Sequence, residues 1–244
     1  MDLFESELRV VTAAQELAES LGSDPNHTVA AAAMDTAGRI HTAVNVHHFT
    51  GGPCAELVVL GVAAAAQAGP LLTIAAAGDG GRGPIPPCGR CRQVLIDLHP
   101  DVMVAVPGGN GPQLRPIRKL LPDTYVHPDA HARRLLRFNK RYYEAVADGT
   151  KTTTIRHDDP VAVGSALFVF EDDQDHRTLD GEITRIERYR LDAVTAEQAG
   201  LAADTTIEQL RAGLRGHYPG LPDDAEIDVV TFALTPEPGP HHVP

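Results

Sequence analysis

Three cysteines, the only ones in the 244-residue chain, constrain the fold more than any other feature. Cys54 stands in Cys54-Ala-Glu56. Cys88 follows 34 residues later and stands with Cys91 in Pro87-Cys-Gly-Arg-Cys91. An odd number of cysteines cannot form a closed set of disulfides, whereas metal ligation accounts for all three. We therefore expect the fold to bring the two segments together around one metal ion.

The residue types in these two segments fit a catalytic zinc site. Three thiolates leave one position of a tetrahedral zinc ion open, which is what a zinc ion needs in order to activate water. Glu56 is placed to carry protons there without binding the metal. Cys-x-Glu followed by Pro-Cys-x-x-Cys is the signature of nucleobase deaminases. The alternatives are buried free thiols, a closed structural zinc site and, for Glu56, an acid that merely begins a helix.

Basic residues near the cysteines are a further part of the pattern. Cys88 and Cys91 are expected to open a helix, whose N–H groups and dipole favour the thiolate form. Arg82, Arg90 and Arg92 are candidates to offset the negative charge of three thiolates, and surface or packing roles are the alternative.

Composition and charge favour a globular enzyme with a small substrate. Hydrophobic residues make up 43% and charged residues 22% of the chain, as in ordinary soluble domains. The net charge of −12 opposes a nucleic-acid partner, because such binding relies on Lys and Arg. No apolar run is long enough to cross a bilayer, and the first residues carry acids where a signal peptide carries bases. We expect a cytoplasmic protein that does not bind membranes.

The first 127 residues show the pattern of a layered α/β domain. Apolar residues at spacings of three and four predict a first helix that Gly22 closes. Short apolar runs between turn residues predict strands. The expected helices cover residues 5–21, 55–68 and 89–98, and the expected strands cover 27–34, 39–46, 71–77 and 102–106.

The second half of the chain has a different pattern, with several strands and few helices. A polar, proline-containing linker is expected at 128–134, a small β-barrel or α+β domain at 135–235, and a loose proline-rich tail at 236–244. The expected strands are 166–170, 179–189 and 227–234, and the expected helices are 140–147 and 206–214.

The first half resembles a known family. Residues 45–60, Asn-Val-His-His-Phe-Thr-Gly-Gly-Pro-Cys-Ala-Glu-Leu-Val-Val-Leu, and 87–95, Pro-Cys-Gly-Arg-Cys-Arg-Gln-Val-Leu, are similar to blasticidin S deaminase and, more broadly, to the tetrameric cytidine deaminases. The resemblance covers residues 8–126. It implies a three-layer α/β domain with a mixed sheet and a homotetramer with sites near subunit borders. It also implies zinc ligation by Cys54, Cys88 and Cys91, acid/base catalysis by Glu56 and a sugar contact by Asn45.

Two positions depart from that family's pattern. His47 stands where nucleoside-specific cytidine deaminases carry a Glu that holds a ribose hydroxyl, and where the blasticidin enzyme carries a Tyr. His127 replaces an aromatic residue of the blasticidin enzyme. The candidate substrate contacts are therefore Asn45, His47 and Arg82, with packing or surface roles as the alternative for His47 and His48.

The second half resembles an ASCH domain, a small β-barrel related to PUA domains, over residues 135–234. The distinctive motif is Gly149-x-Lys151-Thr-x-Thr154-Ile-Arg156, which places an amine, hydroxyls and a guanidinium on a short strand after a helix. Such groups can bind a polar ring or a phosphate.

Some ASCH proteins remove the acyl group of N4-acylcytidine with the Lys and Thr of this motif and a later Glu. Lys151 and Thr154 match, whereas the position of the Glu falls on Ala203, with Asp204 beside it. Binding without hydrolysis and a solvated strand face are the alternatives. Nearby lies a basic run, expected as a solvated helix face or an RNA contact, made of Arg133, Arg134, Arg137, Lys140 and Arg141.

Together these patterns predict hydrolytic, zinc-dependent deamination of the cytosine ring of a nucleoside or nucleoside analogue to the uracil form. The ASCH-like domain would bind or deacylate an N4-modified cytidine. The rival predictions are a resistance deaminase of the blasticidin S type and an RNA-binding protein in which the ASCH-like domain recruits RNA.

Overall fold

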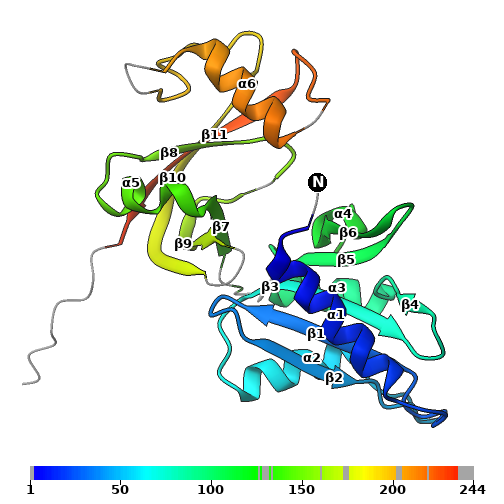
Figure 1. Ribbon diagram of the computed structural model, residues 1–244. Coiled ribbons are helices and arrows are strands. Elements are labelled where there is room, and N and C mark those ends of the chain that lie inside the picture. The colour runs from blue at the N-terminus through cyan, green and yellow to red at the C-terminus, as the bar shows by residue number, and fades with distance from the viewer. Residues whose placement is uncertain are drawn as a thin grey trace, which may run out of the picture. The chain divides into compact units, whose positions relative to one another are not determined.

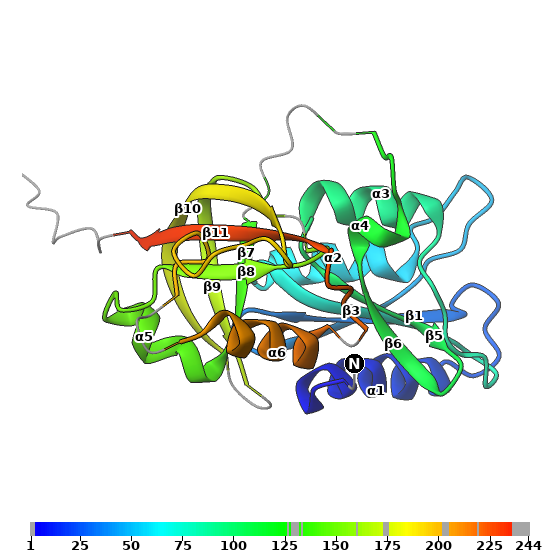
Figure 2. The ribbon, with the colours of Figure 1, turned by 90° about the horizontal axis from the view of Figure 1, so that it is seen from above.

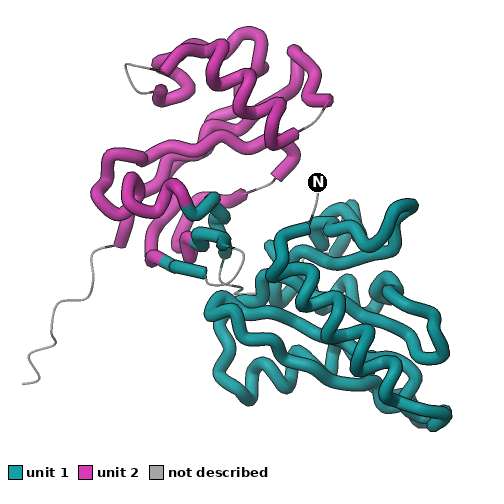
Figure 3. Tube along the Cα trace, viewed as in Figure 1, with its two compact units in different colours: residues 1–140, 169–178 teal, residues 141–168, 179–244 magenta. Residues whose placement is uncertain are grey.

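The protein forms two compact units. The computed structural model describes residues 3–125, 127, 132, 134–159, 161–172, 176–201, 205–218 and 220–235. Unit 1 comprises residues 1–140 and 169–178, and unit 2 comprises residues 141–168 and 179–244 (Figure 3). The predicted tail at 236–244 and most of the predicted linker at 128–134 lie outside the described residues. The domain boundaries proposed from the sequence stay a prediction.

The first 120 residues of unit 1 are built on one six-stranded sheet. Its order is β2-β1-β3-β5-β6, and β4 pairs with β3. Among the described strands of this sheet, β3 and β5 pair in parallel and the other neighbours pair antiparallel, so the sheet is mixed, as expected. The strands are β1 (Val29–Asp35), β2 (Ile40–Val44), β3 (Leu71–Gly78), β4 (Gly83–Pro84), β5 (Met103–Gly108) and β6 (Gly111–Pro116).

Helices cover both faces of this sheet, which gives the three layers expected from the sequence. The helices are α1 (Glu5–Glu19), α2 (Ala55–Ala65), α3 (Gly89–Leu98) and α4 (Ile117–Leu120). Helix α1 lies on one face, and α2 and α3 lie on the other (Figures 1 and 2). Strand β3 is buried along its whole length because both of its faces are covered. The core between the sheet and α2 and α3 includes Val59, Ile74 and Leu95.

Strand β6 and helix α4 were not predicted from the sequence. Strand β6 reads Gly-Pro-Gln-Leu-Arg-Pro, which lacks the β-branched and aromatic residues typical of strands. It forms one edge of the sheet, where a proline without an N–H removes no ladder hydrogen bond. A strand of this composition is therefore stable only because β5 pairs with it.

The rest of the chain contributes a second, five-stranded sheet in the order β7-β9-β10-β11-β8. Within the described residues β7 and β8 form its two edges, so the sheet is a half-barrel, where the sequence predicted a small β-barrel or an α+β domain. Helix α6 packs on a core that includes Leu191, Leu214 and Ile227. The elements are β7 (Arg134–Asn139), a 3-10 turn (Lys140–Tyr142), α5 (Tyr143–Ala147), β8 (Thr153–Arg156), β9 (Gly164–Glu171), β10 (Arg177–Arg190), α6 (Ile207–His217) and β11 (Glu226–Leu234).

The basic run near residue 137 is not a solvated helix face. Arg134 begins strand β7 instead of ending a linker, and its guanidinium binds the Asp101 carboxylate at 2.8 and 3.0 Å. Arg137 lies on the same strand and binds Glu171 at 2.6 Å. These arginines are ion-paired within unit 1 because strand geometry directs them to partners on neighbouring elements. Arg133 lies outside the described residues.

No helix in the described part of the chain combines the length and the apolar character that a membrane crossing requires.

Candidate zinc and active site

Both cysteine segments lie at the beginnings of helices, as the sequence predicted. Cys54 is the N-cap residue of α2 and Cys88 is the N-cap residue of α3, and both have extended backbone angles. Glu56 and Cys91 lie in the first turns of these helices and are buried. Two adjacent helix starts therefore bring the three thiols and one carboxylate together.

The spacing of the thiols fits one tetrahedral zinc ion. Cys88 Sγ lies 3.7 Å from Cys54 Sγ and 3.5 Å from Cys91 Sγ, and the three sulfur atoms lie within 4.8 Å of one another. Zn–S bonds of about 2.3 Å in a tetrahedron separate the sulfur atoms by roughly 3.8 Å. Among the described residues, no fourth His, Cys, Asp or Glu side chain joins this group. Three thiolates would leave one position of a tetrahedral zinc ion for water.

The surroundings shift the pKa values of the three thiols in different directions. Burial acts against the thiolate of Cys88, but hydrogen bonds from the Cys91 and Arg90 N–H groups and from the other two thiols outweigh it and lower the pKa of Cys88. Burial raises the pKa of Cys91 strongly, and Glu56 raises it further. Burial also raises the pKa of Cys54. A divalent ion favours all three thiolates, because it supplies the positive charge that burial withholds.

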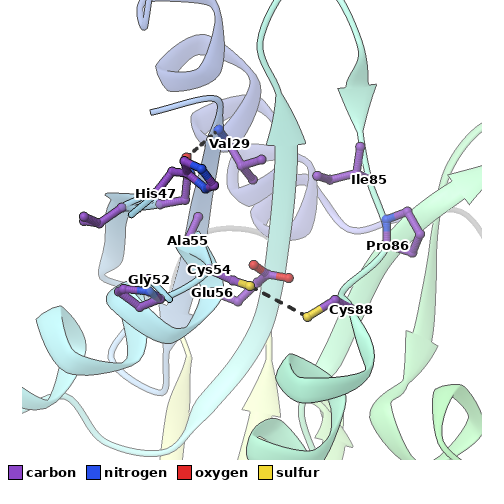
Figure 4. Close-up of a pocket in the computed structure, with 12 residues that line it drawn as sticks. Val29, His47, Gly52, Cys54, Ala55, Glu56, Ile85, Pro86 and Cys88 are labelled. Carbon is purple, nitrogen blue, oxygen red and sulfur yellow. Dashed lines mark hydrogen bonds between the residues drawn. The ribbon is translucent and has the colours of Figure 1, made fainter. Parts of the chain in front are cut away.

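Glu56 lies beside the thiols with its side chain 6% exposed. Burial raises its pKa above the usual carboxyl range. A raised pKa suits a group that must both accept and donate a proton near neutral pH. Figure 4 shows the Glu56 carboxylate next to the facing sulfur atoms of Cys54 and Cys88.

A cavity of about 280 Å³ is lined by Cys54, Cys88 and Glu56. Its walls are largely apolar, which suits a planar heterocyclic ring. The sequence did not predict the apolar wall residues. Some of them adjoin the predicted motifs, because Pro86 precedes Pro-Cys-x-x-Cys and Gly52 and Pro53 precede Cys54. The lining residues are Val29, Asn45, Val46, His47, Gly52, Pro53, Cys54, Ala55, Glu56, Ile85, Pro86 and Cys88 (Figure 4).

Glycine is required at position 52 of the cavity wall. A Cβ atom there would lie 1.7 Å from the Val46 carbonyl oxygen, far inside van der Waals contact. The loop closes at this point because the Val46 N–H donates to the Pro53 carbonyl at 3.1 Å. This close approach of the two sides of the loop fixes the position of Cys54, the N-cap residue of α2.

Two of the three predicted substrate contacts line the cavity. The Asn45 carboxamide oxygen accepts the N–H groups of Thr28 and Val29, both at 2.8 Å, and its amide nitrogen donates to the Asn26 carbonyl at 3.3 Å. The second N–H of the Asn45 carboxamide is left for a ligand. His47 is exposed at the cavity wall.

The arginines near the cysteines tie loops together. Arg82 does not line the cavity, and its guanidinium binds the Thr28 carbonyl and the Asp79 carboxylate. Arg92 donates to the Pro87 carbonyl at 2.8 Å and to the Leu120 carbonyl at 2.7 Å. Arg90 approaches the Gly52 carbonyl at 3.5 Å. The packing role that was the alternative for Arg92 is therefore the one its contacts describe.

The residues of the second motif lie in unit 2. Lys151 precedes β8, Thr154 is buried on that strand, and Arg156 ends it, with its Nε 3.5 Å from Asp159. The strand after a short helix that the sequence predicted is thus present. Asp204, the remaining candidate, lies outside the described residues.

Comparison with known proteins identifies the family. The model of the cytidine and deoxycytidylate deaminase zinc-binding region matches residues 5–106. The cytidine deaminase of Burkholderia pseudomallei is 32% identical to the chain over 51% of this chain and 100% of that one, with a TM-score of 0.40. The chain belongs to the cytidine and deoxycytidylate deaminase family. Zn²⁺ is the cofactor that the family and the cysteine cluster support.

Two mycobacterial members of the family are similar as well. The cytidine deaminase of Mycobacterium leprae is 30% identical over 48% of this chain and 94% of that chain, with a TM-score of 0.37. The cytidine deaminase of Mycobacterium tuberculosis is 30% identical over 51% of this chain and 95% of that chain, with a TM-score of 0.38. Each match spans nearly the whole of the solved deaminase and about half of the present chain.

Proposed function

We propose that this deaminase family member hydrolyses the exocyclic amine of a cytosine nucleoside, or of a nucleoside analogue, to give the uracil form and ammonia. The convergence of three thiols and a buried carboxylate, beside a mostly apolar cavity that Cys54, Cys88 and Glu56 line, carries the proposal. Cys54, Cys88 and Cys91 would hold the zinc ion. Bound there, zinc lowers the pKa of water, which supplies a nucleophile at neutral pH.

Glu56 would carry the protons of the reaction. Its raised pKa lets the carboxylate accept a proton from the attacking water and deliver protons to the ring nitrogen and to the departing ammonia. The apolar walls formed by Val29, Ile85 and Pro86 would hold the planar ring and keep bulk water away. Asn45 and His47 lie on the same cavity and would contact the sugar side.

A substrate panel with Glu56→Gln tests this function. Ammonia release is measured from cytidine, deoxycytidine, N4-acetylcytidine and blasticidin S. The wild type should act on at least one, and E56Q should lose about 10²- to 10⁴-fold in kcat. Zinc content should be unchanged in E56Q, since Glu56 is not a ligand. The matched control is Glu16→Gln, an acid exposed on α1. An E56Q protein as active as E16Q would refute the role of Glu56.

The panel also separates the candidate substrates. A clear preference for blasticidin S would favour the resistance deaminase. Activity on free cytidine would favour nucleoside metabolism. His47 is compatible with either class of substrate, because an imidazole can donate a hydrogen bond to a sugar group or accept one, whereas a carboxylate can only accept. A cytoplasmic location stays a prediction.

The second half supports a further proposal, in which an ASCH-like domain binds or deacylates an N4-modified cytidine. Lys151 precedes β8 and Thr154 lies on it, so the two motif residues that match the family belong to one short segment. Deacylation would produce the substrate of the zinc site. Ammonia release from N4-acetylcytidine should then stop when Lys151 is replaced. RNA recruitment by the same domain is the rival, and a gel shift with a steep salt dependence would favour it.

A homo-oligomer is also proposed, with a tetramer as the expected form. Helix α2 is apolar on all sides except for Glu56, yet only one side of it is buried. Val62 is 40% exposed, and Gly61, Ala64 and Ala65 are exposed beside it. A helix that is hydrophobic all round is normally buried, so a second copy of the chain is the natural cover.

A further inference from the structure

Lys151 is held rigidly at the end of helix α5. Its N–H donates to the Ala145 carbonyl at 2.7 Å. The preceding turn is fixed by Asp148, whose carboxylate accepts the Thr150 N–H at 2.9 Å and the Thr150 hydroxyl at 2.7 Å. Gly149 takes the left-handed conformation with φ +76°, which closes the helix. These contacts therefore fix the backbone of Lys151 in the segment between α5 and β8 (Figure 1).

Lys151 shares an aromatic neighbour with a second cation. Its Nζ lies 4.8 Å from the centroid of the Tyr142 ring, and Arg141 Cζ lies 4.7 Å from the same centroid. Such cation–π contacts hold both cations beside the same ring. The ring thus gathers two positive charges at one point of unit 2.

Among the described residues, the charged groups that shift the pKa of Lys151 are of its own sign. Burial lowers the pKa of Lys151, and Arg156 and Arg141 lower it further by repulsion. In the described part of the chain the Lys151 amine forms no hydrogen bond and no ion pair. Arg156 does have a carboxylate nearby, that of Asp159. Lys151 is half-buried, and an amine withdrawn from water is normally paired with an anion, so this one indicates a ligand that brings its own negative charge.

We propose that Lys151, Arg156 and Arg141 form a binding site for the phosphate group of a small ligand of the nucleoside monophosphate class. A phosphate dianion matches a cluster of several cations, and Arg and Lys are the residues that hold it with charge-assisted hydrogen bonds. The buried hydroxyl of Thr154 lies on the same strand as Arg156, two residues away, and therefore on the same face. The site is distinct from the zinc site.

The size of the ligand follows from the charge of the whole chain. With 33 acidic against 21 basic residues, the chain repels a long polyanion. A single phosphate meets only the local cluster and escapes most of that repulsion. The inference rests on the proposed ligand-binding role of the second half, but neither on its hydrolytic activity nor on the zinc site.

Calorimetric titration tests the site. The probes are inorganic phosphate, adenosine 5′-monophosphate and adenosine, because a purine is not the proposed substrate of the deaminase. Phosphate and the monophosphate should bind the wild type, and adenosine should bind at least ten-fold more weakly than its monophosphate. Lys151→Met should weaken phosphate binding ten-fold or more. The matched control is Lys140→Met, which removes an exposed lysine that already pairs with Asp172 at 2.7 Å.

A second variant and a second readout guard against misfolding. Arg156→Gln, on strand β8, should also weaken phosphate binding while thermal unfolding shows a folded protein. The chain has only three lysines, at positions 119, 140 and 151, so dimethylated lysines give few NMR signals. The pKa reported by the Lys151 signal should rise when phosphate is added.

Two results would overturn the site. One is phosphate affinity in K151M equal to that of K140M. The other is tight binding of an RNA oligonucleotide with no binding of phosphate or the monophosphate. Neither result bears on ammonia release from cytidine, so failure of this site and failure of the deaminase are distinguishable.

Discussion

Two buried carboxylates in the first domain have opposite environments. Asp35 is fully buried and accepts hydrogen bonds from the Ala37 and Arg39 N–H groups, from the Arg39 guanidinium and from His41. Burial alone would raise its pKa, but these donors outweigh burial and lower it. Glu7 is 5% exposed and accepts the Phe4 N–H at 2.8 Å. Burial there dominates and raises the pKa of Glu7 to about 7.

The first prediction concerns Glu7→Gln. The pKa of Glu7 is near 7 in the folded protein and about 4.3 in the unfolded chain. Between these two pH values the Glu7 carboxyl is protonated in the folded protein and ionised in the unfolded chain. Stability is therefore lost as the pH rises from about 4.5 to 7. E7Q keeps an acceptor for Phe4 but cannot ionise, so it should be more stable than the wild type by roughly 1–3 kcal/mol at pH 8, and equal to it near pH 4.

Urea unfolding at the two pH values measures the effect. Glu5→Gln is the control, because Glu5 lies in the same helical turn and is exposed. An E7Q protein that is less stable than the wild type at pH 8 would show that the ionised carboxylate is needed there.

At the scale of elements, the sequence predicts well where local pattern and tertiary environment agree. Helix α3 begins and ends where it was expected, at residues 89 and 98, because a cysteine N-cap and apolar periodicity both indicate a helix. Strand β7 was missed because its arginines resemble a solvated surface, and only their partners Asp101 and Glu171 explain them. A local sequence pattern cannot predict an ion-pair partner that lies more than 30 residues away in the chain.

The loop before α2 gives the second prediction. Gly52→Ala places a methyl group against the Val46 carbonyl, so the loop must open and Cys54 must move. Zinc affinity should fall about 10- to 100-fold, the range seen when the support of a metal ligand is lost. Metal content after dialysis against a weak chelator measures this. Gly213→Ala on α6 is the control, because Gly213 is exposed and its added methyl group meets no atom within 4 Å. Equal zinc retention in both variants would contradict the role given to the loop.

At the scale of the whole molecule, the sequence predicted the convergence of the two cysteine segments, because three thiols and one glutamate have a common chemistry at that spacing. It could not give the cavity walls, since Val29, Ile85 and Pro86 carry no chemical signature. Nor could it show that Asn45 is largely committed to the backbone of residues 26–29, which limits its part in sugar binding. Such limits depend on tertiary contacts.

The exposed apolar side of α2 gives a prediction for the assembly. Val62→Asp puts a charge in the centre of that side, which a subunit contact does not tolerate. Sedimentation velocity should show a homo-oligomer for the wild type and a smaller species for V62D. Thr12→Asp on α1, at an exposed position, should leave the sedimentation coefficient unchanged. A monomeric wild type would contradict the proposed assembly.

The proposed function requires that the thiols of Cys54, Cys88 and Cys91 form a catalytic zinc site. The most direct measurement is the rate of cytosine nucleoside deamination as zinc is titrated into metal-free protein, with bound zinc determined in the same samples. Activity should rise in proportion to bound zinc and level off at about one ion per chain, as one three-thiolate site requires. Full activity without zinc, or stoichiometric zinc binding with no ammonia released from any cytosine nucleoside, would contradict it.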